Sequence, residues 1–360
     1  MIPAPMPTLM VVPTGIGCEI GGYAGDAIPS ARLLASASGC LITHPNVMNG
    51  ASLYWLDNRI HYVEGYALDR FAAGDWQLRP VRRQRLGVLR DAGIEADLTL
   101  RHRQLMEACR ASLGLDIGPV ITSDAPLEVT LETGGSGASW GRLGRPDALL
   151  RAGECLKRAG ASAIAVVARF PDEVDTAALA AYRQGSGVAG LAGAEAVISH
   201  LLVRHLKLPC AHAPALAPLP LDPQVDPRAV AEERGHTFLA CVLVGLSRAP
   251  DLVGDGSCRP DDLMADQRGA VVVPQGALGG EAVLACLERQ VPVITVENRS
   301  VLSVTSDALA MGPDVLHAGS YAEAAGLVMA LREGLAPESL MRPLQPVSYT
   351  HLTLPTIYSV

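Results

Sequence analysis

The 360-residue chain has few aromatic residues, no long basic run and no long uncharged apolar run. No window of about 18 residues is apolar and uncharged, and the N-terminus lacks the basic and apolar regions of a signal peptide. We therefore expect no membrane partner and a cytoplasmic location. The net charge of −8, without a long basic run, also predicts that nucleic acid is not a partner.

Disulfide and zinc motifs are also missing. The eight cysteines are scattered, and no two of them form a C-x-x-C pair. Several lie in apolar segments. This distribution favours buried, reduced thiols over a disulfide framework.

The chain is rich in apolar residues, which make up 49% of it, whereas aromatic residues make up only 4%. Ala, Gly, Leu and Val dominate, which suits helices packed on a parallel sheet. We predict an α/β protein with mainly parallel sheet and flanking helices, arranged as two lobes around a cleft. The proline-rich segment 213–227 is the predicted junction between lobes of about 1–212 and 228–345. The apolar run Phe238–Gly245 is predicted to be a strand.

Residues 346–360 are expected not to be native. The sequence VSYTHL at Val347–Leu352 is the translation of GTC TCT TAT ACA CAT CT, the mosaic end used in transposase-made sequencing libraries. The residues after it would be read-through. We therefore leave this tail out of the fold and expect 1–345 to be a single α/β module.

A glycine-rich stretch follows the first apolar run, in LMVVPTGIGCEIGGYAGD (Leu9–Asp26). A strand, a glycine loop and a helix N-terminus would present free N–H groups to an anion. The stretch lacks the Gly-Lys-Ser/Thr of a phosphate-binding loop and the glycine spacing of a dinucleotide site. It therefore predicts backbone binding of a phosphate or carboxylate, with tight turns alone as the alternative, and it identifies no cofactor.

A segment near the C-terminus repeats this order of features. VVPQGALGG is followed by a predicted helix and strand, just as the first glycine stretch is. The repeat indicates either a decayed duplication or two similar crossovers. In both cases the loops follow strand ends, where open parallel sheets bind ligands.

Polar residues at the predicted strand ends are the candidate site. His44 with Asp124 or Asp172 would be acid–base residues, because the pKa of histidine lies near neutrality. Arg169 would bind a carboxylate or phosphate. Capping and loop hydrogen bonds are the alternative role for each. The other predicted ligand-binding residues are Thr14, Gly15, Gly17, Gly21, Gly22, Asn46, Asn49, Ser136, Gly279, Gly280, Glu297 and Asn298.

A second polar cluster lies on and after the helix predicted from about Ala192 to Leu206. Glu195 and Ser199 are four residues apart and share a helix face. No H-E-x-x-H motif is present, so we predict no metal site. Cys210 or Cys18 paired with a histidine is an alternative nucleophile. The residues that would serve if a metal were bound are Glu195, His200, Cys210 and His212.

Several long strings resemble a family of cyanobacteria and plants, the domain of unknown function 3326 family. They are PTGIGCEIGGYAGDA, LITHPNVMNGA, YVEGYALDRF, SGASWG, VVARFPD, LAGAEAVISHLLV, PCAHAPAL, CVLVGLSRAP and VVVPQGALGG. The resemblance implies one module over nearly the whole native chain. It implies no reaction and no catalytic residue.

These observations lead us to expect a cytosolic enzyme that acts on a small, polar, anionic metabolite in a cleft lined by glycine loops. The alternatives are a non-catalytic small-molecule-binding or regulatory module, and an assembly factor in photosynthetic cells. A small-molecule ligand is the expected partner. The reaction, the cofactor and homo-oligomerisation stay open.

Overall fold

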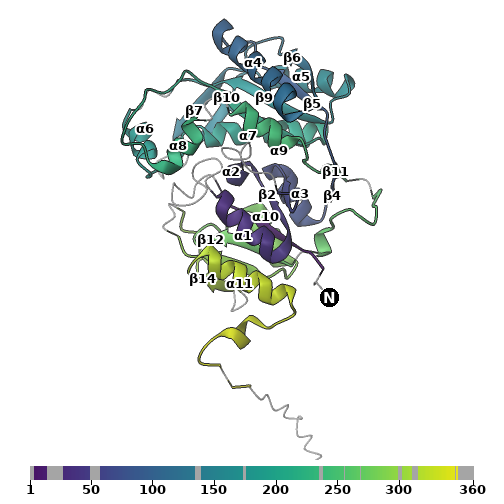
Figure 1. The fold of residues 1–360 in the computed structure, drawn as a ribbon, viewed down its shortest axis with the longest axis vertical. Coiled ribbons are helices and arrows are strands. Elements are labelled where there is room, and N and C mark those ends of the chain that lie inside the picture. The colour runs from purple at the N-terminus through teal and green to yellow at the C-terminus, as the bar shows by residue number, and fades with distance from the viewer. Residues whose placement is uncertain are drawn as a thin grey trace, which may run out of the picture.

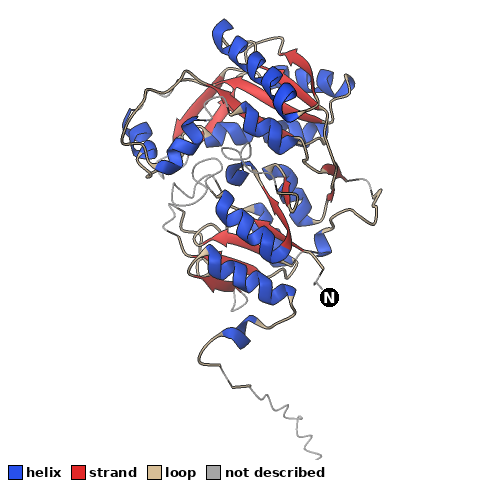
Figure 2. Cartoon of the chain, viewed as in Figure 1, coloured by secondary structure: helices blue, strands red, loops and turns tan. Residues whose placement is uncertain are grey.

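The computed structural model describes residues 4–13, 27–48, 57–133, 139–172, 176–234, 238–254, 256–267, 269–298, 302–309, 315–344 and 346–347. Within these residues the chain forms two parallel sheets with helices on their faces (Figures 1 and 2). The predicted α/β class with mainly parallel sheet is therefore confirmed.

The first sheet is built from both ends of the chain. Its strand order is β14-β13-β12-β1-β2-β3, and every pairing in it is parallel. We call this sheet and its helices lobe 1. Its strands are β1 (Met6–Met10), β2 (Gly39–Thr43), β3 (Ile60–Tyr62), β12 (Ala270–Pro274), β13 (Val293–Val296) and β14 (Val315–Ala318). Its helices are α1 (Ile28–Ser38), α2 (Pro45–Met48), α3 (Gly65–Ala73), α10 (Glu281–Glu288) and α11 (Tyr321–Arg332), with the 3-10 turns η3 (Ala265–Gln267) and η4 (Pro337–Leu340).

The second sheet is built from the middle of the chain. Its order is β10-β9-β5-β6, again with parallel pairings. We call this sheet, its helices and the antiparallel β7–β8 hairpin lobe 2. Its strands are β5 (Leu86–Arg90), β6 (Ile117–Thr122), β7 (Val129–Thr133), β8 (Ser139–Leu143), β9 (Ala163–Arg169) and β10 (Cys210–Ala215). Its helices are α4 (Ala96–Leu113), α5 (Pro146–Arg158), α6 (Thr176–Arg183), α7 (Ala192–Leu206), α8 (Pro227–Arg234) and α9 (Leu239–Leu246).

In the described part of the chain, the backbone passes between the lobes twice, through two short strands. β4 (Gln77–Arg79) leads from lobe 1 to lobe 2, and β11 (Asp251–Val253) leads back. The two pair antiparallel, and we call them the ribbon; they lie at the right of Figure 1. The lobes therefore do not divide where the sequence suggested. Segment 213–227 joins β10 to α8 inside lobe 2, because prolines exclude regular structure locally but do not decide which sheet later strands join.

Local sequence explains most elements, with one clear exception. α5 begins at Pro146, and α1 ends where Gly39 adopts a left-handed conformation with φ of 78°. The predicted strand Phe238–Gly245 was wrong, because this run forms α9. α9 packs on β9 and β10 and is buried on nearly all sides, so its residues are apolar throughout and show no helical period.

Each parallel sheet reverses its strand order once. The reversal lies between β1 and β12 in lobe 1 and between β5 and β9 in lobe 2. Ligands of open parallel sheets bind beyond the carboxyl ends of the strands at such a point. The two similar sequence segments therefore start from neighbouring strands, β1 and β12, although residues 14–26 lie outside the described part of the chain.

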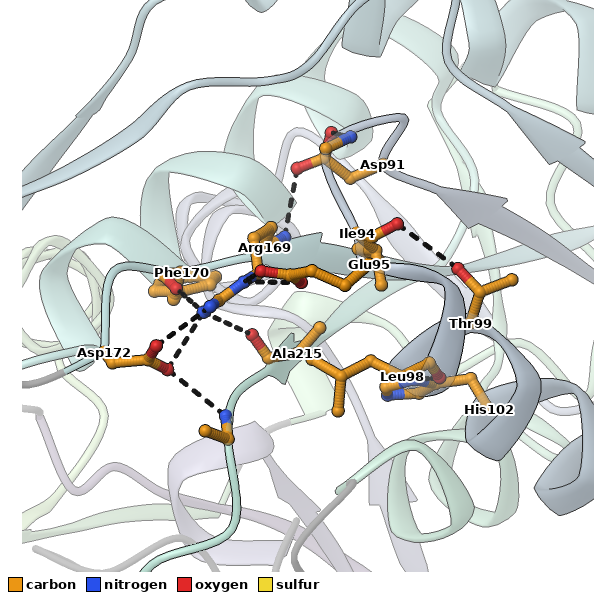
Figure 3. A network of polar contacts seen from close by, with 12 residues as sticks. Asp91, Ile94, Glu95, Leu98, Thr99, His102, Arg169, Phe170, Asp172 and Ala215 are labelled. Atoms are coloured by element: carbon orange, nitrogen blue, oxygen red, sulfur yellow. Dashed lines mark hydrogen bonds and ion pairs between the residues drawn. The ribbon is translucent and has the colours of Figure 1, made fainter.

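At the reversal point of lobe 2, the buried carboxylate of Asp91, which is seen beside Arg169 in Figure 3, connects three segments. Its Oδ1 accepts hydrogen bonds from the backbone N–H groups of Gly93 at 2.9 Å and Leu127 at 3.0 Å. Its Oδ2 accepts one from the N–H of Arg169 at 3.0 Å. The ends of β5 and β9 are thereby held to the segment that precedes β7.

Replacing Asp91 with alanine should destabilise the protein markedly, because it leaves three backbone donors without this acceptor. We expect Asp91→Ala to lower the free energy of unfolding by roughly 3 kcal/mol in urea titrations. Asp116→Ala, at an exposed position in the same lobe, is the matched control and should change it by less than about 0.5 kcal/mol. Similar losses in the two variants would contradict this role for Asp91.

Candidate functional site

Polar side chains from both lobes meet where α3 of lobe 1 packs against α7 of lobe 2. Two come from strand ends of lobe 1, and four come from α7 and β10 of lobe 2. We call this set the interlobe cluster. It consists of His44, Glu64, Glu195, Ser199, His200 and His212.

Glu64 lies at the centre of the cluster. It follows β3 and is the N-cap of α3, where its carboxylate accepts a hydrogen bond from the N–H of Tyr66 at 2.9 Å. Its side chain is 3% exposed. Burial disfavours the charged form and raises the pKa of Glu64 to about 8. The carboxyl group therefore keeps its proton at neutral pH.

His200 of α7 reaches Glu64 from the other lobe. Its Nε2 lies 3.1 Å from Oε1 of Glu64, and its side chain is 42% exposed. Burial, and next the nearby His212, lower the pKa of His200. Near neutral pH the pair is therefore uncharged. A protonated acid beside a proton acceptor is an arrangement suited to proton transfer.

Gly65 allows this close approach of the lobes. A Cβ atom built on Gly65 would lie 2.8 Å from Nε2 of His200, so any side chain would displace the imidazole. The ring of Tyr66 lies 6.3 Å from the His200 ring. Gly65 and Tyr66 both belong to the first turn of α3.

His212 on β10 is held from both sides by residues of α7. Its Nδ1 hydrogen-bonds Oγ of Ser199 at 2.5 Å, and its Nε2 lies 3.6 Å from Oε1 of Glu195. Ser199 and His212 are both buried. The four-residue spacing that placed Glu195 and Ser199 on one helix face thus brings both to the same imidazole.

His44, the leading acid–base candidate from the sequence, lies at the end of β2. Its Nε2 accepts a hydrogen bond from the N–H of Val12 at 2.9 Å, and Asn46 donates to the carbonyl of Val12 at 2.7 Å. Burial, and next His200, lower the pKa of His44 to about 4. The imidazole is therefore neutral, and this nitrogen is already engaged in holding the end of β1.

The other acid–base candidates are engaged in ion pairs within lobe 2. Asp124 receives two hydrogen bonds from Arg151, at 2.7 and 2.9 Å. Asp172 lies 2.9 Å from Arg169, which also lies 2.9 Å from Glu95 (Figure 3). The guanidinium predicted to bind a ligand anion is thus neutralised by two carboxylates. Neither aspartate is in contact with His44 in the described structure.

The predicted binding residues on the second glycine segment and its neighbouring strand lie at the carboxyl edge of lobe 1. Gly279 and Gly280 precede α10, whose N-terminus is already capped by Asp69, since Oδ1 accepts from the N–H of Ala282 at 3.0 Å. Glu297 is exposed after β13, and the Nδ2 of Asn298 is buried without a hydrogen-bond partner among the described residues. The predicted site residues outside the described part of the chain are Thr14, Gly15, Gly17, Gly21, Gly22, Asn49 and Ser136, together with Cys18.

The described residues contain no group of three or more His, Cys, Asp or Glu side chains arranged to hold a metal ion. Cys210 was an alternative metal ligand and nucleophile in the sequence. It is buried, and its thiol donates to the carbonyl of Leu208 at 3.3 Å. Burial raises the pKa of Cys210, which disfavours the thiolate that either role requires. No disulfide links the seven cysteines of the described chain.

Glu64 is the residue that the sequence analysis missed. It directly follows the strand-like run Ile60–Val63 and precedes a glycine, in the string YVEGY. The argument that selected His44, a polar residue at the end of a parallel strand, applies equally to Glu64. The pairing with His200 could not be foreseen, because the two residues are far apart in sequence and belong to different lobes.

Comparison with known proteins gives one family and one curated relative. The family model described as "Protein of unknown function (DUF3326)" matches residues 7–341, which confirms the resemblance seen in the sequence. The chain is 52% identical over 350 residues to an uncharacterised lipoprotein of Synechococcus sp. (strain ATCC 27144 / PCC 6301 / SAUG 1402/1), and the match covers 97% of each chain. No solved structure matches.

The relative's name contradicts the cytoplasmic location predicted above, because a lipoprotein is held at a membrane by its lipid. The prediction was based on the lack of a long apolar run and of a signal peptide, and lipid attachment needs no membrane-spanning helix. Among the described residues, the helices are all too short or too polar to span a bilayer.

The raised pKa of Glu64 predicts how stability depends on pH. The neutral carboxyl favours the folded state below its ordinary pKa of 4.5, and this contribution is lost as the pH rises through the folded value of about 8. Glu64→Gln removes the titration, so its stability relative to the wild type should rise between pH 5 and pH 9, by on the order of 3 kcal/mol. Urea titrations across this range measure the difference, and a constant difference would contradict burial of a neutral Glu64.

The Gly65 contact predicts opposite effects for two glycine substitutions in helices. Gly65→Ala should destabilise the protein by about 1 kcal/mol or more, because the new methyl group displaces His200. Gly326→Ala is the matched control, since a Cβ at this exposed position of α11 meets nothing within 4 Å. It should stabilise by about 0.5–1 kcal/mol through helix propensity alone. Stabilisation of equal size in both variants would argue against the close approach.

Proposed function

We propose, on the premise that this chain belongs to the "Protein of unknown function (DUF3326)" family, that it is an enzyme which transfers a proton to or from a small polar anionic metabolite. The observation that supports this most directly is the contact between the protonated Glu64 and the neutral His200 across the lobes. Shifted pKa values on adjacent groups are typical of acid–base sites.

In this proposal Glu64 is the general acid. Its pKa of about 8 keeps it protonated at neutral pH, yet the proton can leave without a large energy cost. His200 is the general base, because its imidazole is neutral and its side chain is partly exposed to an arriving ligand. The pair would take a proton from one atom of the metabolite and give one to another.

Ser199, Glu195 and His212 support the pair in this proposal. Their contacts fix the orientation of His212 beside α7, and the nearby imidazole helps to keep His200 neutral. The anionic group of the metabolite is assigned to the glycine-rich segment after β1 on sequence grounds alone. Arg169 is not assigned to it, since its guanidinium already pairs with Glu95 and Asp172.

A binding protein without catalysis is the second candidate. Two observations favour it: the relative is named a lipoprotein, and two lobes joined by short crossings are an arrangement common to proteins that close around a ligand. The interlobe cluster would then recognise the ligand by hydrogen bonds. The two candidates differ in whether a bound metabolite is converted.

A ligand screen followed by a turnover assay tests the proposal. Carboxylated and phosphorylated metabolites are screened by thermal shift, and each compound that raises the melting temperature by several degrees is followed by proton NMR in deuterated buffer. We expect exchange or isomerisation of one hit, with Glu64→Gln lowering the rate by about 100-fold or more and the affinity by less than about 3-fold.

Asp116→Asn, at an exposed position in lobe 2, is the control and should leave the rate unchanged. A hit that binds but is never converted would favour the binding protein. The absence of any hit, or conversion that survives Glu64→Gln, would overturn the assignment.

A further inference from the structure

The covalent connection between the lobes is slight. In the described chain the only crossings lie at β4 and β11, and these pair over three residues each: Gln77 with Val253, Leu78 with Leu252 and Arg79 with Asp251. No strand of one sheet pairs with a strand of the other among the described residues. Among the described residues, the backbone therefore links the lobes only at the ribbon.

Side chains hold the end of the ribbon where Arg79 pairs with Asp251, which is the end nearer lobe 2. Arg79 forms an ion pair at 2.9 Å with Asp262, in the segment that returns to lobe 1. The Nε2 of Gln84, in the segment that leads to β5, donates to the carbonyl of Ala249 and to Oδ1 of Asp251, both at 2.8 Å. The two crossings are thereby held to each other by side chains as well as by strand pairing.

There is also space for the ribbon to bend. A cavity of about 440 Å³ lies beside β11, between it and the turn that joins α7 to β10. Residues 251–254 line it on the ribbon side, and Ser162 with Lys207–Pro209 line it on the lobe 2 side. A change in the angle between the lobes would widen or narrow this cavity without disturbing either sheet.

Most of the contact between the lobes is made by helices. α3 packs on α7, and α9 packs on α2 and, at Gly245, against the ring of Tyr62 in β3. Packed helices can slide or separate at modest cost, whereas paired strands cannot. The contact between Glu64 of lobe 1 and His200 of lobe 2 therefore depends on the angle between the lobes.

From these observations we infer that the two lobes rotate as units about the ribbon, and that closure assembles the site by bringing His200 onto Glu64. Gly65 is a positioning residue in this motion, because it leaves room for the imidazole at closure. The inference rests on the proposed function only for the role of Glu64 and His200. The motion itself is tested without a ligand, so failure of either can be distinguished.

Distances between spin labels measure the motion in the full chain. Labels at Leu33→Cys in α1 and Leu113→Cys in α4, both exposed, report the separation of the lobes, in a Cys258→Ser background that removes the exposed native thiol. Leu33→Cys with Leu284→Cys in α10 is the control within lobe 1. We expect the interlobe distance distribution to be about twice as broad as the control, or to have two peaks. Equal widths would overturn the inference.

A substitution at the ribbon provides a second measurement. A Cβ on Gly254 would lie 2.8 Å from Cδ1 of Trp76, so Gly254→Ala should change the ribbon's angle. We expect the mean interlobe distance to shift by several ångströms while the control distance within lobe 1 stays constant. An unchanged interlobe distance in the folded variant would count against bending at the ribbon. If circular dichroism shows that the variant does not fold, the wild-type widths decide the question.

Discussion

The parallel pairing of β1 with β12 is the constraint on which the rest of the structure depends. It joins Thr8 to Ala270 and Met10 to Val272, residues that are far apart in the chain. Because the two ends of the chain share one sheet, everything between β4 and β11 must leave lobe 1 and return to it. The second lobe, its two crossings and the contact of α3 with α7 all follow. The same pairing places the ends of β1 and β12 side by side at the reversal point of the sheet.

The interlobe cluster shows how ionisable groups can be buried between two lobes without matching countercharges. Taking an isolated charge out of water costs far more than a hydrogen bond returns, so such groups shift their pKa values and become neutral. Glu64 does so by keeping its proton, and His44 does so by giving its proton up. In lobe 2 the opposite solution is used, where Arg169 stays charged between Glu95 and Asp172 near the surface. Of these three side chains, Glu64, with a pKa of about 8, is the one that can exchange a proton near neutral pH.

The sequence predicted features that depend on neighbouring residues. Pro146 and Gly39 mark helix ends because their backbone preferences act locally, and the ends of β2 and β12 were found from apolar runs followed by polar residues. Features that depend on distant residues were missed. α9 is buried on nearly all sides, so it lacks the periodicity that identifies a helix. Asp124 and Arg169 were selected as candidate site residues, but Asp124 pairs with Arg151 and Arg169 pairs with Glu95. The predicted lobe boundary differs from the observed one for the same reason, because pairing between strands far apart in the chain decides which strands share a sheet.

The position of β1 has a consequence for how far the chain can be shortened. β1 comprises Met6–Met10 and is paired on both edges, so it is the strand that holds the two halves of the first sheet together. A cut after these residues would remove the middle of a folded sheet and expose the edges of β2 and β12. This fold therefore requires that residues 6–10 stay in the mature polypeptide.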